Sequence, residues 1–194
     1  MSTLDLIQAL KPKSIFDVVP EYFFPERDTP GHREYIRGGN YYEWKYAVAA
    51  HLAPRSILEI GVRYGYSLAC FIHGSGQVVE VEGWDSCSYK EDSNRIAEDN
   101  LKPCLNGMSY QFFKQDATQA TEAVPWDLVH IDGPHTHAGT LHCLRLLKDS
   151  RAILVDDVYD CHDDLQACKD FVQETRREFV VLPSLRGDFL ILNS

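Results

Sequence analysis

The feature that most constrains the fold is a regular alternation of strand-like and helix-like segments, which begins at Tyr41 and continues to the end of the chain. Short runs rich in Val, Ile, Leu and aromatic residues are separated by segments with helical periodicity. We expect strands at 56–61, 77–85, 109–116, 127–132, 152–157, 178–183 and 188–193. We expect helices at 41–53, 65–73, 92–101, 136–148 and 162–177. Seven strands interleaved with helices predict an α/β fold with a doubly wound, Rossmann-like sheet.

The connection between the last two expected strands indicates their relative direction. Only the residues SLRG, at 184–187, join them. A right-handed crossover between parallel strands needs many more residues, so these two strands should pair antiparallel. We therefore expect a mostly parallel sheet with its last strand antiparallel and with helices on both faces.

Chain length and composition indicate one domain with an N-terminal arm. The chain has 194 residues, of which 44% are hydrophobic, enough for the core of one ordinary domain. We assign that domain to residues 41–194. Residues 1–40 are rich in Pro, Tyr, Phe and charged side chains, and their apolar content is too high for a disordered segment. We therefore expect residues 1–40 to form an arm packed on the domain.

The charge distribution and the cysteines exclude several classes of protein. The formal net charge is −10 and the Lys and Arg residues are scattered, which argues against a nucleic-acid partner. No segment resembles a secretion signal or reaches membrane-spanning length, so we expect a soluble, cytoplasmic protein with no membrane partner. The six cysteines lack CxxC spacing, and we expect them to be free thiols. Composition is compatible with a homo-oligomer but does not determine the oligomeric state.

The stretch ILEIGVRYGYSLACFI at 57–72 contains the first candidate binding site. Gly61 and Gly65 allow a tight turn after a strand, and the N–H groups that begin the next helix can face an anion. Glu59 should lie beside this turn. An ordinary strand-to-helix turn with a solvated glutamate is an equally good interpretation of these residues alone. Neither GxGxxG nor GxxxxGK[ST] occurs, which argues against a dinucleotide site and a P-loop.

Two more acidic residues follow the next two expected strands. Asp85 ends the second strand and Asp116 ends the third. A carboxylate at the first position can accept both hydroxyls of a ribose, and one at the second can accept an exocyclic amine. Each aspartate alone is compatible with a turn or a helix cap. Acidic residues at the ends of three successive strands favour an adenosine-containing ligand.

These residues resemble the class I S-adenosylmethionine-dependent methyltransferases. The segment EIGVRYGYS is similar to their first motif, and in particular to that of catechol O-methyltransferase. The resemblance covers about residues 41–194. It implies that Glu59, Gly61 and Gly65 shape the cofactor loop and that Ser67 meets the methionine carboxylate. It also implies that Asp85 holds the ribose and that Asp116 lies at the adenine edge.

Three aspartates in the second half of the chain predict a metal site. Asp132 ends one expected strand, and Asp156 and Asp157 end its neighbour. Carboxylates this close repel one another, and a hard divalent cation would relieve the repulsion. Ligation by oxygen alone suits Mg²⁺ better than zinc. A turn at Asp132 and a helix start at Asp156 are the alternative interpretations.

His135, three residues after Asp132, is the candidate catalytic base. The segment DGPHTH resembles the D-G-x-H-[ST] segment of metal-dependent O-methyltransferases that act on sugars and macrolides, which implies a general base at His135. A histidine with an ordinary pKa near 6.5 can accept a hydroxyl proton at neutral pH. An alternative is that His135 only caps the following helix. A zinc cluster of His135, His137, His142 and Cys143 is less favoured because two well-spaced ligand pairs are missing.

Together with these residues, the resemblance implies an O-methyltransferase that uses S-adenosylmethionine and Mg²⁺. Its partner would be a small-molecule acceptor with a hydroxyl group, such as a sugar, a polyketide or a phenol. Two alternatives remain: a non-catalytic module that binds the cofactor, and another nucleotide-binding α/β enzyme such as a sugar-nucleotide transferase or a dehydrogenase. A binding module would not need the candidate base or the three metal-site aspartates.

Overall fold

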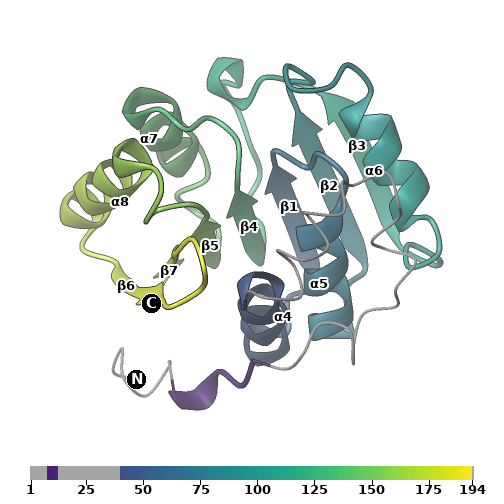
Figure 1. Cartoon of the computed structure of the whole chain (residues 1–194), viewed down its shortest axis with the longest axis horizontal. Helices are drawn as coiled ribbons and strands as arrows, with labels where there is room; N and C mark the ends of the chain where they lie inside the picture. Colours follow the sequence, from purple (N-terminus) through teal and green to yellow (C-terminus); the bar gives the residue numbers. More distant parts are fainter. Residues whose placement is uncertain (1–7, 13–39, 194) are drawn as a thin grey trace.

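The computed structural model of the protein describes residues 8–12 and 40–193, and its core is one seven-stranded sheet (Figure 1). The strands are β1 (Ser56–Ile60), β2 (Glu80–Asp85), β3 (Ser109–Lys114), β4 (Leu128–Ile131), β5 (Ala152–Val155), β6 (Glu178–Leu182) and β7 (Asp188–Leu192). The helices are α4 (Tyr41–Leu52), α5 (Tyr66–Ser75), α6 (Ser93–Leu101), α7 (His137–Leu146) and α8 (His162–Thr175), with a short 3-10 helix η2 (Ala117–Gln119). The expected 1–40 arm lies almost entirely outside the described residues.

The strand order is β3-β2-β1-β4-β5-β7-β6. Strands β3, β2, β1, β4 and β5 are parallel, whereas β7 runs antiparallel to both β5 and β6. This confirms the expected fold class, including the antiparallel last strand. The strand order reverses between β1 and β4, and ligands bind at such a switch point in open α/β sheets.

Alternate residues of the central strands pack on opposite faces of the sheet, as the two-residue period of a strand requires. Ile57, Leu128 and Leu154 belong to a core shared with α4, α5 and the end of α6. Leu58 and Val129 belong to a second core shared with α7 and α8. Figure 1 shows α7 and α8 lying beside each other, well separated from α4 and α5. Because helices cover both faces of the sheet, we expect a ligand-binding site at the carboxyl ends of its strands.

Hydrogen bonds continue past the strand ends and align the loops that follow them. The N–H of Gly61 donates to Trp84 O at 2.8 Å, and the N–H of Asp132 donates to Ile60 O at 2.8 Å. The N–H of Asp156 donates to the carbonyl of the last residue of β4 at 3.0 Å. Consequently the residues directly after β1, β4 and β5 lie in one row at the same edge of the sheet.

The expected and observed elements differ mainly at their ends. Strand β2 begins at Glu80, three residues later than expected, and α8 ends at Thr175 because Arg176 adopts a left-handed conformation with φ of 59°. All six cysteines are free thiols, as expected. Among the described residues, no helix is long and apolar enough to span a bilayer.

Candidate active site

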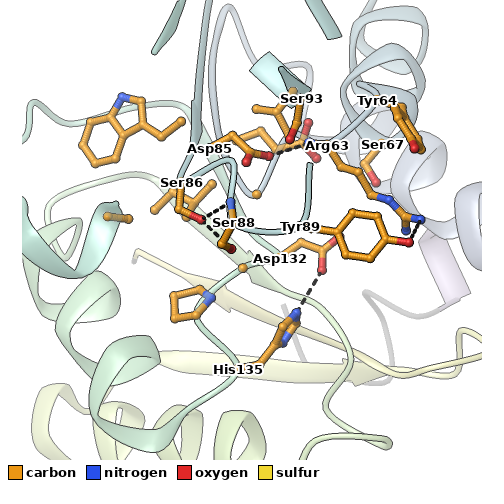
Figure 2. A pocket seen from close by; sticks show the side chains of 18 of the residues that line it. Arg63, Tyr64, Ser67, Asp85, Ser86, Ser88, Tyr89, Ser93, Asp132 and His135 are labelled. Atoms are coloured by element: carbon orange, nitrogen blue, oxygen red, sulfur yellow. Dashed lines mark hydrogen bonds and ion pairs between the residues drawn. The ribbon is translucent and has the colours of Figure 1, made fainter. Parts of the chain in front are cut away.

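A cavity of about 840 Å³ lies at the carboxyl ends of the parallel strands. Its walls come from the loops after β1, β2, β3, β4 and β5 and from the start of α4. The cavity is lined by eight of the ten residues predicted from sequence: Glu59, Gly61, Ser67, Asp85, Asp116, Asp132, His135 and Asp157. Figure 2 shows Ser67 and Asp85 on one side of this space and Asp132 with His135 on another. Of the other two predicted residues, Gly65 is the N-cap residue before α5, and Asp156 is buried and does not line the cavity.

Gly61 brings the β1 loop against the loop that follows β4. Its φ is +86°, and a Cβ at this position would lie only 1.7 Å from the carbonyl oxygen of Asp132. Gly65 has φ of +82° and is the N-cap residue of α5, where a Cβ would lie 2.7 Å from a methyl carbon of Leu101. Both positions therefore favour glycine for conformation, and Gly61 also requires it for space because the obstacle there is main chain.

Glu59 is 1% exposed, so it is not the solvated side chain of an ordinary turn. Its Oε1 lies 2.7 Å from His130 Nδ1, on the adjacent strand β4. Burial raises the pKa of Glu59, against the opposing effect of His130. Burial alone would lower the pKa of His130, but Asp156 and Glu59 raise it to about 9. The other carboxylate oxygen of Glu59 is buried and has no hydrogen-bond partner among the described residues, so it can accept a bond from a ligand.

Asp85 and Asp116 both organise the loops that carry them. Asp85 accepts the main-chain N–H of Arg63 at 2.8 Å on one oxygen and that of Cys87 at 2.6 Å on the other. It thereby ties the β1 loop to the β2 loop. Asp116 caps η2 by accepting the main-chain N–H of Thr118 at 2.9 Å. The cap predicted as an alternative for Asp116 is present, and the same residue also lines the cavity.

Asp132, His135 and Asp157 form one group of potential metal ligands, with ligand atoms within 4.8 Å of one another. Burial, followed by the charge of Asp156, raises the pKa of Asp132 to about 7. The same two causes raise the pKa of Asp157. One oxygen of Asp157 accepts a bond from Arg186 Nη1 at 3.0 Å. Its Oδ1 is buried without a hydrogen-bond partner among the described residues.

Asp156, next to Asp157 in the sequence, is buried and belongs to a separate network of charged side chains. Its Oδ2 accepts a hydrogen bond from the Tyr41 hydroxyl and lies 3.0 Å from Lys45 Nζ, while its Oδ1 accepts the main-chain N–H of Asp157 at 2.8 Å. Lys45 also contacts Asp188 at 3.1 Å. Burial would raise the pKa of Asp156, but Lys45 and His130 hold it well below its usual range. Asp156 is thus already satisfied by protein donors.

His135 is held by a carboxylate that the sequence did not reveal. Its Nδ1 lies 2.9 Å from Asp164 Oδ2, and its Nε2 lies 3.7 Å from Asp132 Oδ1 (Figure 2). The hydrogen bond to Asp164 raises the pKa of His135 to about 9, although burial acts in the opposite direction. Thr136, and not His135, caps α7, because the Thr136 hydroxyl accepts the N–H of Gly139.

The other histidines of this region have separate partners. His137 Nε2 lies 2.9 Å from Asp170, and His142 Nε2 lies 2.8 Å from the carbonyl oxygen of Ala120. Within residues 8–12 and 40–193, no group of potential metal ligands contains His137, His142 or Cys143. The described part of the chain therefore gives no support to the alternative of a zinc cluster.

Comparison with known proteins identifies the family. The profile of the methyltransferase domain matches residues 58–158, which is more than half of the chain and extends from β1 to the loop after β5. The chain belongs to this methyltransferase family. A search of curated proteins gave no match. Membership excludes the alternatives of a dehydrogenase and a sugar-nucleotide transferase.

Several methyltransferases of known structure share the fold of this chain. The structure of Podospora anserina methyltransferase PaMTH1 with bound SAH gives a TM-score of 0.61 at 18% identity, covering 95% of this chain and 89% of that one. The structure of a putative caffeoyl-CoA O-methyltransferase from Staphylococcus aureus gives a TM-score of 0.62 at 15% identity, and the match covers 98% of this chain and 97% of that one. The structure of an O-methyltransferase from Bacillus cereus in complex with SAH gives a TM-score of 0.55 at 18% identity, and the match covers 98% of this chain and 96% of that one. These matches confirm the class I methyltransferase fold.

Proposed function

We propose that this methyltransferase transfers the methyl group of S-adenosylmethionine to a hydroxyl group of a small molecule. In this proposal a divalent cation, Mg²⁺, is bound at the group formed by Asp132, His135 and Asp157, which we call the acidic group. The observation that carries this proposal is that one cavity holds both the glycine turn with Asp85 and the group of Asp132, His135 and Asp157. The first set suits a nucleoside and the second suits deprotonation of an alcohol. A module that only binds the cofactor would need the first set alone.

The cofactor would lie along the loops after β1, β2 and β3. Asp85, Asp116 and Ser67 all line the cavity. In this proposal Asp85 would accept ribose hydroxyls, Asp116 the adenine amine, and Ser67 at the start of α5 would meet the methionine carboxylate. The buried, unpaired oxygen of Glu59 can accept a bond from the cofactor ammonium group. SAH is bound in two of the structurally similar proteins, which supports the same ligand here.

The residues of the acidic group fit a hard divalent cation. Asp132 and Asp157 face the cavity, both have a raised pKa, and Asp157 Oδ1 is a buried acceptor without a partner among the described residues. These two carboxylates would hold the ion, which when bound would supply positive charge that favours ionisation of the acceptor hydroxyl. Asp156 remains the third predicted ligand, although it would have to share oxygens that already accept protein hydrogen bonds.

His135 would remove the proton of the acceptor hydroxyl through Nε2. Its Nδ1 is directed at Asp164, and its Nε2 is directed at Asp132 and the cavity. An imidazole must be neutral before it can accept a proton, and the negative charges of Asp132 and Asp157 contribute to the raised pKa of His135. Positive charge at these carboxylates would lower that pKa toward the neutral range.

The acceptor itself would be a small polar molecule such as a sugar, a polyketide or a phenol. The cavity of about 840 Å³ has room beyond the cofactor loops, and its wall includes Tyr41 and Tyr42. An aromatic wall beside carboxylates suits a molecule with an apolar ring face and hydroxyl groups.

A methyl-transfer screen tests this proposal. Purified protein is incubated with labelled S-adenosylmethionine and with sugars, polyketides and phenols, in Mg²⁺ or in EDTA, while calorimetry compares binding of S-adenosylmethionine and NAD. We expect binding of S-adenosylmethionine alone and transfer that needs the metal. His135→Ala should lower kcat by roughly 10² to 10⁴ with unchanged cofactor affinity and melting temperature. A folded His135→Ala variant that turns over at the wild-type rate, or a protein that does not bind S-adenosylmethionine, would contradict the proposal.

A further inference from the structure

The loop after β4 and the first turn of α8 form a carboxylate–histidine pair that the sequence did not predict. Asp164 is 2% exposed, and its Oδ2 lies 2.9 Å from His135 Nδ1. Its other oxygen accepts a hydrogen bond from the Thr140 hydroxyl on α7 at 2.5 Å. Both oxygens of this buried carboxylate are therefore occupied, one by the candidate base and one by a neighbouring helix.

We infer that Asp164 is the positioning residue for His135, setting both the tautomer and the direction of its imidazole ring. This inference rests on the proposed function, in which His135 accepts a proton. A carboxylate can only accept at Nδ1, so the neutral ring must carry its hydrogen on Nδ1 and present a lone pair at Nε2. Nε2 is the nitrogen that lies toward Asp132 and the cavity.

The surroundings of His135 show why the ring needs such a partner. The side chain is 43% exposed, so packing alone does not hold it. The backbone of His135 has φ of 43°, in the left-handed region that residues other than glycine rarely adopt. Thr140 fixes Asp164 from α7, and Asp164 in turn fixes the ring from α8. The position of the nitrogen that faces the cavity therefore depends on the packing of α7 on α8.

A second histidine–aspartate pair, between the first residue of α7 and α8, provides a control. His137 Nε2 lies 2.9 Å from Asp170 Oδ2, at the same distance as the pair of His135 and Asp164. Neither His137 nor Asp170 lines the cavity. Asp170 is more exposed than Asp164, but the two contacts have the same length. Loss of the Asp170 carboxylate therefore removes a histidine–aspartate contact to α8 without affecting the proposed base.

The experiment compares Asp164→Asn with Asp170→Asn in the full-length protein. For Asp164→Asn we expect kcat to fall roughly 10- to 100-fold, with KM for both substrates and the melting temperature nearly unchanged, because an amide can donate to Nδ1 and favour the wrong tautomer. Nitrogen-15 NMR of histidine-labelled protein, assigned with His135→Gln, should show hydrogen on Nδ1 of neutral His135 in the wild type and on Nε2 in Asp164→Asn. Asp170→Asn should change neither readout.

The outcomes separate this inference from the proposed function. If His135→Ala loses turnover while Asp164→Asn keeps both kcat and the wild-type tautomer, the positioning role is wrong and the proposed base stands. A wild-type ring with hydrogen on Nε2 also overturns the positioning role. If His135→Ala keeps full turnover, the proposed base itself is wrong. Should Asp164→Asn fail to fold, Thr140→Val gives the same test, because it removes only the donor that holds Asp164: a mixed tautomer with lowered kcat supports the inference, and no change in either overturns it.

Discussion

The ammonium group of Lys45 lies 3.0 Å from the carboxylate of Asp156, and neither side chain is exposed to solvent. The same ammonium group lies 3.1 Å from Asp188. Burial alone would lower the pKa of Lys45, but these two carboxylates raise it well above its ordinary value. Lys45 therefore remains charged and compensates the acidic residues beneath the cavity.

Replacement of Lys45 by Met should strongly destabilise the fold. It would leave Asp156 and Asp188 buried without their cation, and loss of one partner of a buried ion pair typically costs about 3–5 kcal/mol. Urea unfolding measures the loss. Lys102→Met is the control, because Lys102 pairs with Asp99 on the surface and its loss should have no measurable effect. Wild-type stability of Lys45→Met would show that the network does not depend on this charge.

The free energy of unfolding should fall as the pH rises from about 7 to 9. The folded-state pKa of His130 is raised to about 9, so its contribution is fully present below the ordinary pKa near 6.5 and is lost as pH passes 9. Over this window the loss from the fully buried His130 is on the order of 2–3 kcal/mol. His135 has a similar shift but is 43% exposed, so solvent screening reduces its share.

Denaturant titrations at several pH values, in EDTA, check this dependence. His130→Gln should flatten the curve more than His135→Gln does, since only the first removes a fully buried histidine. An unchanged slope in His130→Gln would assign the pH dependence to another group.

Gly61→Ala should damage both the fold and the site, whereas Gly107→Ala should be mild. The two glycines have φ of +86° and +81°, so the conformational cost of a side chain, about 1 kcal/mol, is similar. A Cβ at 61 would collide with the carbonyl oxygen of Asp132 at 1.7 Å, whereas a Cβ at 107 meets nothing within 4 Å. Thermal unfolding and cofactor titration of both variants measure the difference. Equal stability of the two would show that the loops after β1 and β4 can separate at little cost.

Asp85→Ala should weaken the binding of S-adenosylmethionine. Hydrogen bonds to a charged group contribute about 1.5–3 kcal/mol each, so the dissociation constant should rise roughly 10-fold or more. Because Asp85 also accepts the N–H groups of Arg63 and Cys87, Asp85→Asn, which keeps one acceptor oxygen, should have a smaller effect. Calorimetry measures both, with the surface variant Asp92→Ala as control. Unchanged affinity in Asp85→Ala would remove Asp85 from the ribose site.

Chelation should abolish turnover and leave cofactor binding nearly intact. Asp157→Asn should raise the Mg²⁺ concentration needed for half-maximal activity, because it changes a carboxylate that faces the cavity. Asp156→Asn should raise the same requirement and also lower stability, because it removes the charge that Lys45 compensates. Activity and urea unfolding, each measured across a Mg²⁺ series, separate the two effects. Full turnover in excess EDTA would contradict the metal site.

The sequence alone was sufficient to predict the order and type of the elements. Hydrophobic periodicity is a local property, so the seven strands could be located to within three residues of their ends. The four residues SLRG were enough to predict that β7 is antiparallel, because so short a connection excludes a crossover. The acidic residues that follow the parallel strands lie at one edge of the sheet, and eight of the ten predicted site residues line one cavity.

Only the tertiary structure decided which charges meet. Glu59 was compatible with a solvated turn until the pairing of β1 with β4 placed it against His130, 71 residues away in sequence. Asp164 was not among the predicted site residues, and it meets His135 only because α8 packs on α7. No local pattern indicates these contacts, because the strength of a buried charge pair depends on the partner that the chain folds against it and on the water that both lose.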